Sequence, residues 1–488
     1  LYFQDDWKVS RKLLLNLGLR WDKDYNMIGG SDIKNSRTYL DLVTVNSPIS
    51  NPYVSSIAHD DNLDFSPRIG FAYDISGRGT HVLRGGYGLY YGNVFQNIPL
   101  FMEQQGNATI FQGVLSLSGA DIVPGTGIPL NQWKFGVDPL PTIPAPSGTL
   151  ANGATGRLID PNYRNPVTEE TNVGYSWGLS TNSVIELEYV HVLSLHENRT
   201  INVDPNIPVD PNNINTLSRT GAPGGFFRPF DAGFAAAGVP VLGSVRDEQS
   251  SGRSRYDGLN VSYKQRMTHH VSVQANYTLS RALGYDIGTN AGFRNYPRDP
   301  QNPFSPFEFG PTFQDERHHV TVSGILDLPL GIEFSPILQI GSARPYNVFG
   351  STNELNLGGG SDSGAIVVPN SDPTNYTAFL DATGSIDQLA SSKCYYSGQC
   401  HVVGFNSLRG NPYYDMDARL AKNIKMGESR NLQLSFQAFN LFNHANYGNN
   451  FQSDPTSSTF RQPLGFINPT STTLPRAFIG EFGVRFTF

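Results

Sequence analysis

Apolar and polar residues alternate with a period of two in segments of roughly nine to fourteen residues along the whole chain. Between Leu13 and Asp22, the odd positions up to Trp21 are apolar, and the positions between them include Asn16, Gly18 and Arg20. Successive side chains of a β-strand point to opposite faces, so this pattern predicts strands with one apolar and one polar face. The length is typical of a tilted strand that crosses a bilayer rather than of a soluble strand of about five or six residues.

The pattern predicts thirteen strands in an all-β, antiparallel transmembrane β-barrel. The polar face of these strands is rich in Gly, Ser, Asn and Gln, which suits a hydrated lumen better than a close-packed core. The strands are expected near residues 1–9, 12–23, 66–75, 80–91, 168–179, 182–192, 257–267, 270–281, 317–328, 331–342, 413–424, 430–441 and 476–488.

The connections between these strands alternate between short turns and stretches of tens of residues dense in Gly, Pro, Asn and Ser. Outer-membrane barrels have short periplasmic turns and long extracellular loops, so the alternation predicts which end of each strand faces outward. An antiparallel barrel does not close on thirteen strands. We therefore expect an incomplete wall with two unpaired edges, and an odd number of further strands upstream of Leu1.

The composition supports a membrane β-protein and argues against a helical protein and a nucleic-acid-binding protein. Charged residues are 16% of the 488 residues, against about 25% in an ordinary soluble domain, and 50 Gly with 33 Pro disfavour a helical protein. Aromatic residues reach 12%, yet the mean hydropathy is −0.31, as expected when apolar and polar residues are interleaved. A net charge of −7 offers no basic face for nucleic acid, so we predict no nucleic-acid partner.

No pattern in the chain predicts catalysis, a metal site or a cofactor. The segment 174–178 matches the G-x-S-x-G motif of serine hydrolases, but Ser176 lies inside an alternating strand, whereas the motif needs a strained turn. Glu186 and Glu188 share one face of a strand, which is also the arrangement of a glycosidase pair. We interpret both as residues that line a wet lumen, and we predict that the protein is not an enzyme.

Several charged residues fall on the polar faces of the expected strands. Arg residues there attract an anionic solute or pair with nearby acids, and the pattern leaves both readings open. The candidates for a solute path are Arg20, Arg68, Arg84, Glu186, Glu188 and Arg266. The two cysteines, Cys394 and Cys400, are close enough in sequence for a loop disulfide, although two unpaired thiols are the alternative.

The last strand ends in an alternating apolar pattern that closes on a terminal Phe. This pattern resembles the signal by which the outer-membrane assembly machinery recognises its barrels, so we expect that machinery to be a partner. The residues of this expected signal are Phe482, Val484, Phe486 and Phe488.

Several motifs together resemble the TonB-dependent outer-membrane receptors, and more specifically their Oar-like group. The motifs are YFQDDWKV at 2–9, LNLGLRW at 15–21, SPRIGFAY at 66–73, LRGGYG at 83–88, DERH at 315–318 and FNLFNH at 439–444. The resemblance implies a 22-stranded barrel with an N-terminal plug, a TonB box and a regulatory-like domain. Residues 1–488 then form the C-terminal portion of one barrel domain, without the plug or the N-terminal domains.

The function implied by this resemblance is the uptake of a scarce solute across the bacterial outer membrane. The implied partners are membrane lipid and TonB, which the missing N-terminal part would bind. A passive porin or an adhesin on a barrel scaffold shares the strand features and stays an alternative. A soluble all-β carbohydrate-binding or propeller-like protein is a weaker alternative, because the loops vary in length and carry no repeat.

Overall fold

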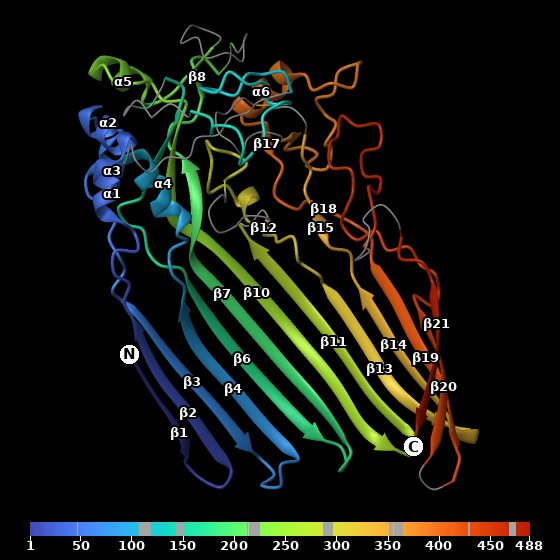
Figure 1. Ribbon diagram of the computed structural model, residues 1–488. Helices are drawn as coiled ribbons and strands as arrows, with labels where there is room; N and C mark the ends of the chain where they lie inside the picture. Colours follow the sequence, from blue (N-terminus) through green and yellow to red (C-terminus); the bar gives the residue numbers. More distant parts are fainter. Residues whose placement is uncertain are drawn as a thin grey trace.

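The computed structural model describes residues 1–45, 47–106, 119–142, 150, 152–211, 213, 225–285, 296–350, 355, 365–427, 430–467 and 475–488. One sheet of 15 strands dominates it, and thirteen of them form a continuous wall in chain order (Figure 1). The wall strands are β1 (Tyr2–Lys8), β2 (Leu13–Asp22), β3 (Asp64–Asp74), β4 (His81–Tyr91), β6 (Val167–Gly178), β7 (Ser183–Asn202), β10 (Ser244–Thr268), β11 (Val271–Gly284), β13 (His318–Leu328), β14 (Ile332–Gly341), β19 (Tyr413–Lys425), β20 (Asn431–Phe439) and β21 (Ile479–Thr487).

The thirteen predicted wall strands and the all-β fold class are confirmed. Each wall strand pairs antiparallel with the next, and the short turns lie at one end of the wall while the long connections lie at the other (Figure 1). Among the described residues, β1 and β21 each have a single partner strand, so the sheet is open with these two strands as its edges.

Two predicted strands are too short. We expected strands near 182–192 and 257–267, whereas β7 has 20 residues and β10 has 25. Beyond the wall, the two strands continue as a ribbon inside the loop layer, where β5 (Thr155–Ile159) pairs parallel with β10. There both faces are covered, and Arg199, Thr200 and Ile201 are buried in succession, so the alternation that signals a membrane strand disappears.

The long connections form a folded layer at one end of the wall (Figure 1). Each of its elements is short, and the sequence pattern predicted none of them. The layer contains α1 (Gly30–Asn35), α2 (Arg37–Val45), α3 (Asn51–Val54), α4 (Asn97–Gly106), α5 (Asp231–Ala237), α6 (Gln388–Tyr396), η1 (Pro306–Glu308), β5, β8 (Ile207–Pro208), β9 (Phe226–Phe227), β12 (Gly310–Pro311), β15 (Pro345–Tyr346), β16 (Val367–Pro369), β17 (Cys400–Val402) and β18 (Leu408–Arg409).

The hydrophobic core of the described residues lies in this loop layer. One cluster packs Ile98 and Met102 of α4 against Ile33 of α1, and another packs Leu42 of α2 against Phe234 of α5. Two more clusters surround β16 and β17. The layer therefore has the apolar interior of a folded unit, which loose surface loops lack.

The wall, in contrast, exposes its apolar face. Ile69 is 55% exposed and Val173 is 48% exposed, although both lie in the middle of long paired strands. In the described part of the chain, no helix is both long and apolar enough to cross a membrane. Apolar side chains on a wide, uncovered sheet face indicate contact with lipid rather than with water.

Candidate functional site

The polar face of the wall forms a concave, charged surface. Antiparallel pairing sets directly opposed residues on the same face, and Gly174 of β6 lies opposite Arg84 of β4 and Glu188 of β7. Residues of eight wall strands, from β6 to β20, line one cavity of about 910 Å³ on the wall. Strands so far apart in the sheet line a common space because the wall curves around it. Lining residues that carry charge or amides include Lys264, Arg266, Gln274, Glu333, Asp417, Arg419 and Gln437.

Glu186 is the centre of an ionic cluster on this face. Its Oε1 accepts a hydrogen bond from Arg84 Nη2 at 3.2 Å, and its Oε2 accepts one from Lys264 Nζ at 2.7 Å. Ser176 Oγ donates to the same carboxylate at 3.4 Å from the neighbouring strand. Because Glu186 pairs with two cations from other strands, its role is to link wall strands through ion pairs.

The structure places the other predicted lumen residues on the same face of the wall or at its rim. Glu188 Oε1 accepts a hydrogen bond from Asn172 Nδ2 at 3.3 Å, and Arg20 Nε lies 2.7 Å from Asp22 Oδ2. Arg68 lies over the ring of Tyr90, 4.5 Å from its centre, and lines a separate recess of about 400 Å³. Arg266 lies at the turn end of β10. The six residues are therefore spread over the wall and do not form one compact site.

The polar face of the wall carries a second charged cluster, which we did not predict from the sequence. Arg419 donates to Glu333 Oε1 at 3.1 Å and to Gln433 Oε1 at 2.8 Å, linking β19 to both of its neighbours. Arg476 pairs with Asp415 Oδ2 at 2.7 Å. The signal was present in the sequence, because Asp415, Asp417 and Arg419 occupy alternate positions of one strand and so share one face.

The segment that matches the serine hydrolase motif lies in a regular strand. Ser176 lies inside β6 in regular pairing with Val82 and Glu186, so the strained turn of a serine hydrolase is missing at this motif. Within the described parts of the chain, no group of three or more His, Cys, Asp or Glu side chains has metal-binding geometry.

Buried ion pairs connect different loops of the layer. Arg199, from the extension of β7, lies with its Nη2 3.5 Å from Glu308 Oε2, and both side chains are almost completely buried. The Glu308 carboxylate also accepts hydrogen bonds from the backbone N–H groups of Arg298 and Asp299, at 3.1 and 2.8 Å. Burial raises the pKa of Glu308 to about 7 and lowers the pKa of Arg298 to about 10.

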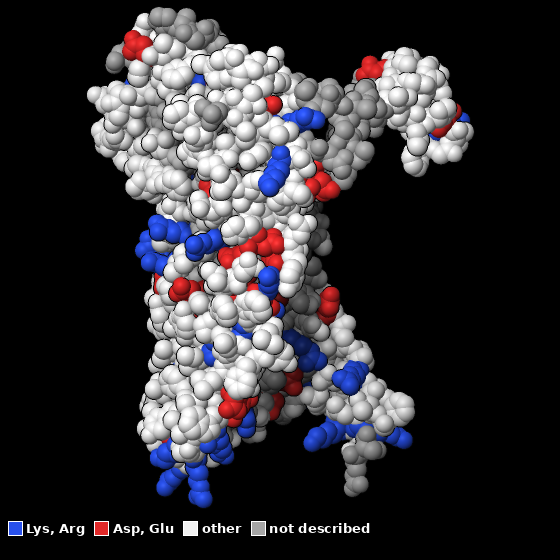
Figure 2. All heavy atoms as spheres, turned by 90° about the vertical axis from the view of Figure 1, so that its left-hand side faces the viewer, with Lys and Arg blue, Asp and Glu red and all other residues white. Residues whose placement is uncertain are grey.

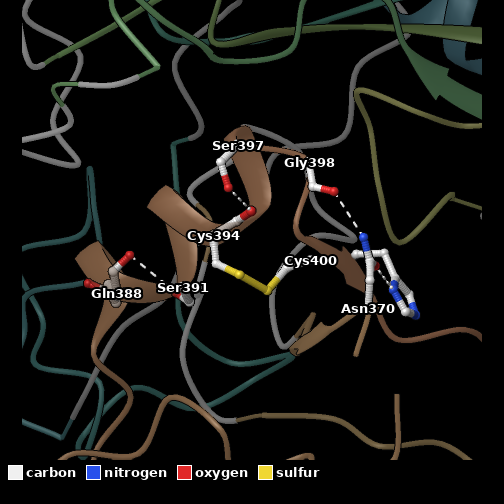
Figure 3. The surroundings of a disulfide bond; sticks show 8 residues. Asn370, Gln388, Ser391, Cys394, Ser397, Gly398 and Cys400 are labelled. Atoms are coloured by element: carbon white, nitrogen blue, oxygen red, sulfur yellow. Dashed lines mark hydrogen bonds between the residues drawn. A yellow bond between two sulfur atoms is a disulfide. The ribbon is translucent and has the colours of Figure 1, made fainter. Parts of the chain in front are cut away.

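A disulfide links α6 to β17 in this layer (Figure 3). The sulfur atoms of Cys394 and Cys400 are 2.02 Å apart. Asp387 begins α6, because its Oδ1 accepts a hydrogen bond from the N–H of Ala390 at 3.0 Å. Next to the disulfide, Asn370 Nδ2 donates to the carbonyl of Gly398 at 2.9 Å, as Figure 3 shows. The segment after α6 is thus fixed to the β16–β17 pair.

Positive charge gathers at the end of the wall that carries the short turns. Figure 2 shows Lys and Arg at the lower tips of the molecule. Lys8, Arg11, Lys12 and Arg78 are exposed there. A carboxylate at the same end, Asp74, accepts hydrogen bonds from Ser76, Gly77 and Gly79 within its own turn.

Residues 1–478 match the family described as "Outer membrane beta barrel domain", and the chain belongs to this family. This membership and the fold locate the protein in the bacterial outer membrane. No curated protein matches the chain. Among solved structures, the outer membrane transporter YddB from Escherichia coli is similar over 100% of this chain, at 12% identity and a TM-score of 0.50.

Two further solved structures are similar to the chain at lower TM-scores. They are the ferripyoverdine receptor of the outer membrane of Pseudomonas aeruginosa (10% identity, TM-score 0.40) and a mutant of the ferric enterobactin receptor from the same organism (9% identity, TM-score 0.43), each matched over 100% of this chain. The chain covers 44% of the YddB structure and 38% and 44% of the other two, so it spans less than half the length of these relatives.

Proposed function

We propose that this chain is the C-terminal portion of the barrel of an outer-membrane TonB-dependent transporter, of the Oar-like group, that takes up a scarce solute. In this proposal, upstream strands complete the wall, and a plug joined to a TonB box fills the lumen. The solute binds at the loop layer and passes along the polar face, near Arg20, Arg68, Arg84, Glu186, Glu188 and Arg266. No chemical step is required.

The observation that carries this proposal is the folded loop layer above a curved, charged wall. A passive porin needs an open mouth, whereas these loops have buried hydrophobic clusters and buried ion pairs such as Arg199–Glu308. Ordered loops of this kind are suited to holding a ligand before transport. The charged polar face of the wall disfavours a simple adhesin, because an adhesin does not use the interior of its barrel.

Electrical recording tests the proposal without knowledge of the solute. The purified full-length protein is inserted into planar lipid bilayers, and the same protein without its plug segment serves as the matched control. We expect the full-length protein to show almost no steady conductance and the control to form large channels. A full-length protein that conducts like the control contradicts the proposal and supports a passive porin.

A second measurement addresses energy coupling. We expect the full-length protein to bind the periplasmic domain of TonB from the same bacterium, and to lose this binding when its N-terminal TonB box is deleted. Equal binding with and without that box contradicts the energised mechanism.

A further inference from the structure

A groove of about 660 Å³ lies on the loop layer, between the segment that leads into η1 and the end of α6. Its volume is within the range of small-molecule sites, roughly 300–1,000 Å³. The groove is formed by Asp299, Gln301, Asn302, Pro303, Phe304, Ser305, Pro306, Phe307, Tyr395, Tyr396, Gly398, Cys400 and His401.

Aromatic rings in the groove are exposed although they are held in place. Phe304 is 54% exposed and Phe307 is 45% exposed. Phe307 stacks on His401, with 3.8 Å between ring centres and 12° between ring planes. Tyr396 packs edge to face on Tyr395, which leaves Tyr396 at the groove wall. Large apolar rings that stay uncovered on an ordered surface indicate a surface for a ligand.

The polar groups of the groove are mainly neutral amides and hydroxyls. Gln301 Nε2 donates to Tyr396 Oη at 3.0 Å, and Asn302 Nδ2 donates to Tyr395 Oη at 2.9 Å. Among the described residues that line the groove, none is Lys or Arg, and Asp299 is the one acid. Asp299 is 5% exposed, and its carboxylate accepts hydrogen bonds from Tyr395 and Asn302.

The groove also contains one imidazole, that of His401. Burial lowers the pKa of its imidazole, which favours the neutral form of this side chain. Its Nδ1 lies 2.7 Å from Asn370 Oδ1, which fixes the ring against Phe307. The groove therefore offers aromatic faces and neutral hydrogen-bonding groups, with no free charge among its described lining residues.

The backbone of the groove is also fixed. Three prolines, Pro300, Pro303 and Pro306, restrict the segment, and the carbonyl of Pro303 accepts a hydrogen bond from the buried Arg199 at 2.5 Å. On the other side, the disulfide between Cys394 and Cys400 holds Tyr395 and Tyr396. A rigid site loses little conformational entropy when it binds a ligand.

We propose that this groove binds a neutral oligosaccharide, which is the solute class taken up by the transporter. The inference rests on the proposed function for the uptake step, whereas the binding step rests on the groove alone. A pyranose ring has an apolar C–H face with partial positive charge, which fits the negative π-face of Phe304 or Phe307. Its rim of hydroxyls fits amides such as Gln301, which donate and accept. An anionic chelate would find no cation among the described lining residues.

Binding to the purified full-length protein in detergent tests this assignment. Maltotriose, cellotriose and xylotriose are the probes, measured by saturation-transfer NMR and calorimetry, with choline as a cationic comparison and glucuronate as an anionic one. We expect at least one trisaccharide to bind and neither charged probe to compete with it. Failure of all three trisaccharides, or displacement of a bound trisaccharide by choline or glucuronate, overturns the assignment.

Matched variants locate the binding. Phe304→Ala with Phe307→Ala removes two ring faces, so affinity for the bound trisaccharide is expected to fall roughly tenfold or more. Phe304→Trp, which keeps a ring, should retain binding. Phe442→Ala removes a ring that is 71% exposed outside the groove, and its affinity should stay within about twofold of the wild-type value. Unchanged affinity in the double variant, with the folded barrel still heat-modifiable, overturns the assignment.

The two proposals fail separately in these experiments. If a trisaccharide binds at the groove but the protein neither excludes current nor binds TonB, the sugar assignment holds and energised uptake fails. If the protein binds TonB and stays closed in bilayers but no trisaccharide binds, energised uptake holds and the sugar assignment fails.

Discussion

Glu308 is a single side chain that links three parts of the loop layer. Its carboxylate faces Arg199 from the extension of β7, and it accepts hydrogen bonds from the backbone of Arg298 and Asp299. Arg298 in turn donates to the carbonyl of Val348 at 2.8 Å. A buried acid with such partners holds its surroundings in one arrangement, although desolvation makes its ionised form costly.

Glu308→Gln is expected to change how the stability of the loop layer depends on pH. The pKa of Glu308 is about 7 in the folded layer and 4.5 without burial, so the folded state binds its proton more tightly. The contribution of Glu308 to the free energy of unfolding is therefore fully present below about pH 4.5 and declines as the pH rises to about 7, by about 3 kcal/mol at most.

Hydrogen exchange of the backbone around residues 298–308, followed from pH 4.5 to 8, measures this effect. The difference between wild type and Glu308→Gln should shift with pH in favour of the variant. Asp372→Asn changes an exposed carboxylate of the same layer and is the matched control. A difference between wild type and Glu308→Gln that stays constant over this range contradicts the prediction.

At the scale of elements, the α6–β17 disulfide stabilises one segment of the loop layer. A disulfide that closes a loop of about six residues contributes about 2 kcal/mol in the chain-entropy view. Replacing Cys394 and Cys400 together by Ser should therefore speed backbone hydrogen exchange between α6 and β17 and weaken binding at the groove. Ser397→Ala, which removes the hydroxyl that donates to the carbonyl of Cys394 but keeps the disulfide, is the comparison. Unchanged exchange in the double variant would show that packing alone holds this segment.

The last strand is an element with a predicted role in assembly. Phe482 packs against Phe436 of β20, with ring centres 4.8 Å apart, while Phe488 is 90% exposed. Because Phe488 contributes little packing here, Phe488→Ala should lower the amount of heat-modifiable barrel in the outer membrane without lowering its melting temperature. Thr487→Ala, at the end of β21 and next to Phe488 in the sequence, is the control. Equal amounts of folded barrel for Phe488→Ala and wild type contradict an assembly role.

The elements differ in how far the sequence predicts them. The wall strands were predictable because each has lipid on one face and a polar space on the other, which imposes the period of two. The extensions of β7 and β10 lie outside that environment, so their pattern gave no signal. The α-helices of the loop layer have four to ten residues and depend on partners from distant loops. The Arg199–Glu308 pair and the groove were not predictable either, because contacts between residues far apart in the sequence create them.

At the scale of the whole molecule, the main feature is the open wall with its two edge strands, β1 and β21. β1 is exposed along its whole length, and β21 has one paired edge and several large exposed side chains, among them Val484 at 74%. Unpaired backbone groups are very costly in lipid, which is why membrane strands occur in closed barrels. In the proposed function, upstream strands pair with both edges in the membrane.

The whole-molecule prediction follows from these edges. Residues 1–488 expressed alone, behind an export signal, should fail to give a heat-modifiable barrel and should be degraded or aggregate, since two open edges favour pairing between copies. The full-length protein should fold in the same host and resist heat in detergent until its barrel melts. Co-expression of the upstream strands as a separate chain offers a stricter comparison, because they should pair with β1 and β21 and restore a folded species. A monomeric, heat-modifiable barrel formed by residues 1–488 alone would show that β1 and β21 close on each other, and would contradict the proposal that upstream strands complete the wall.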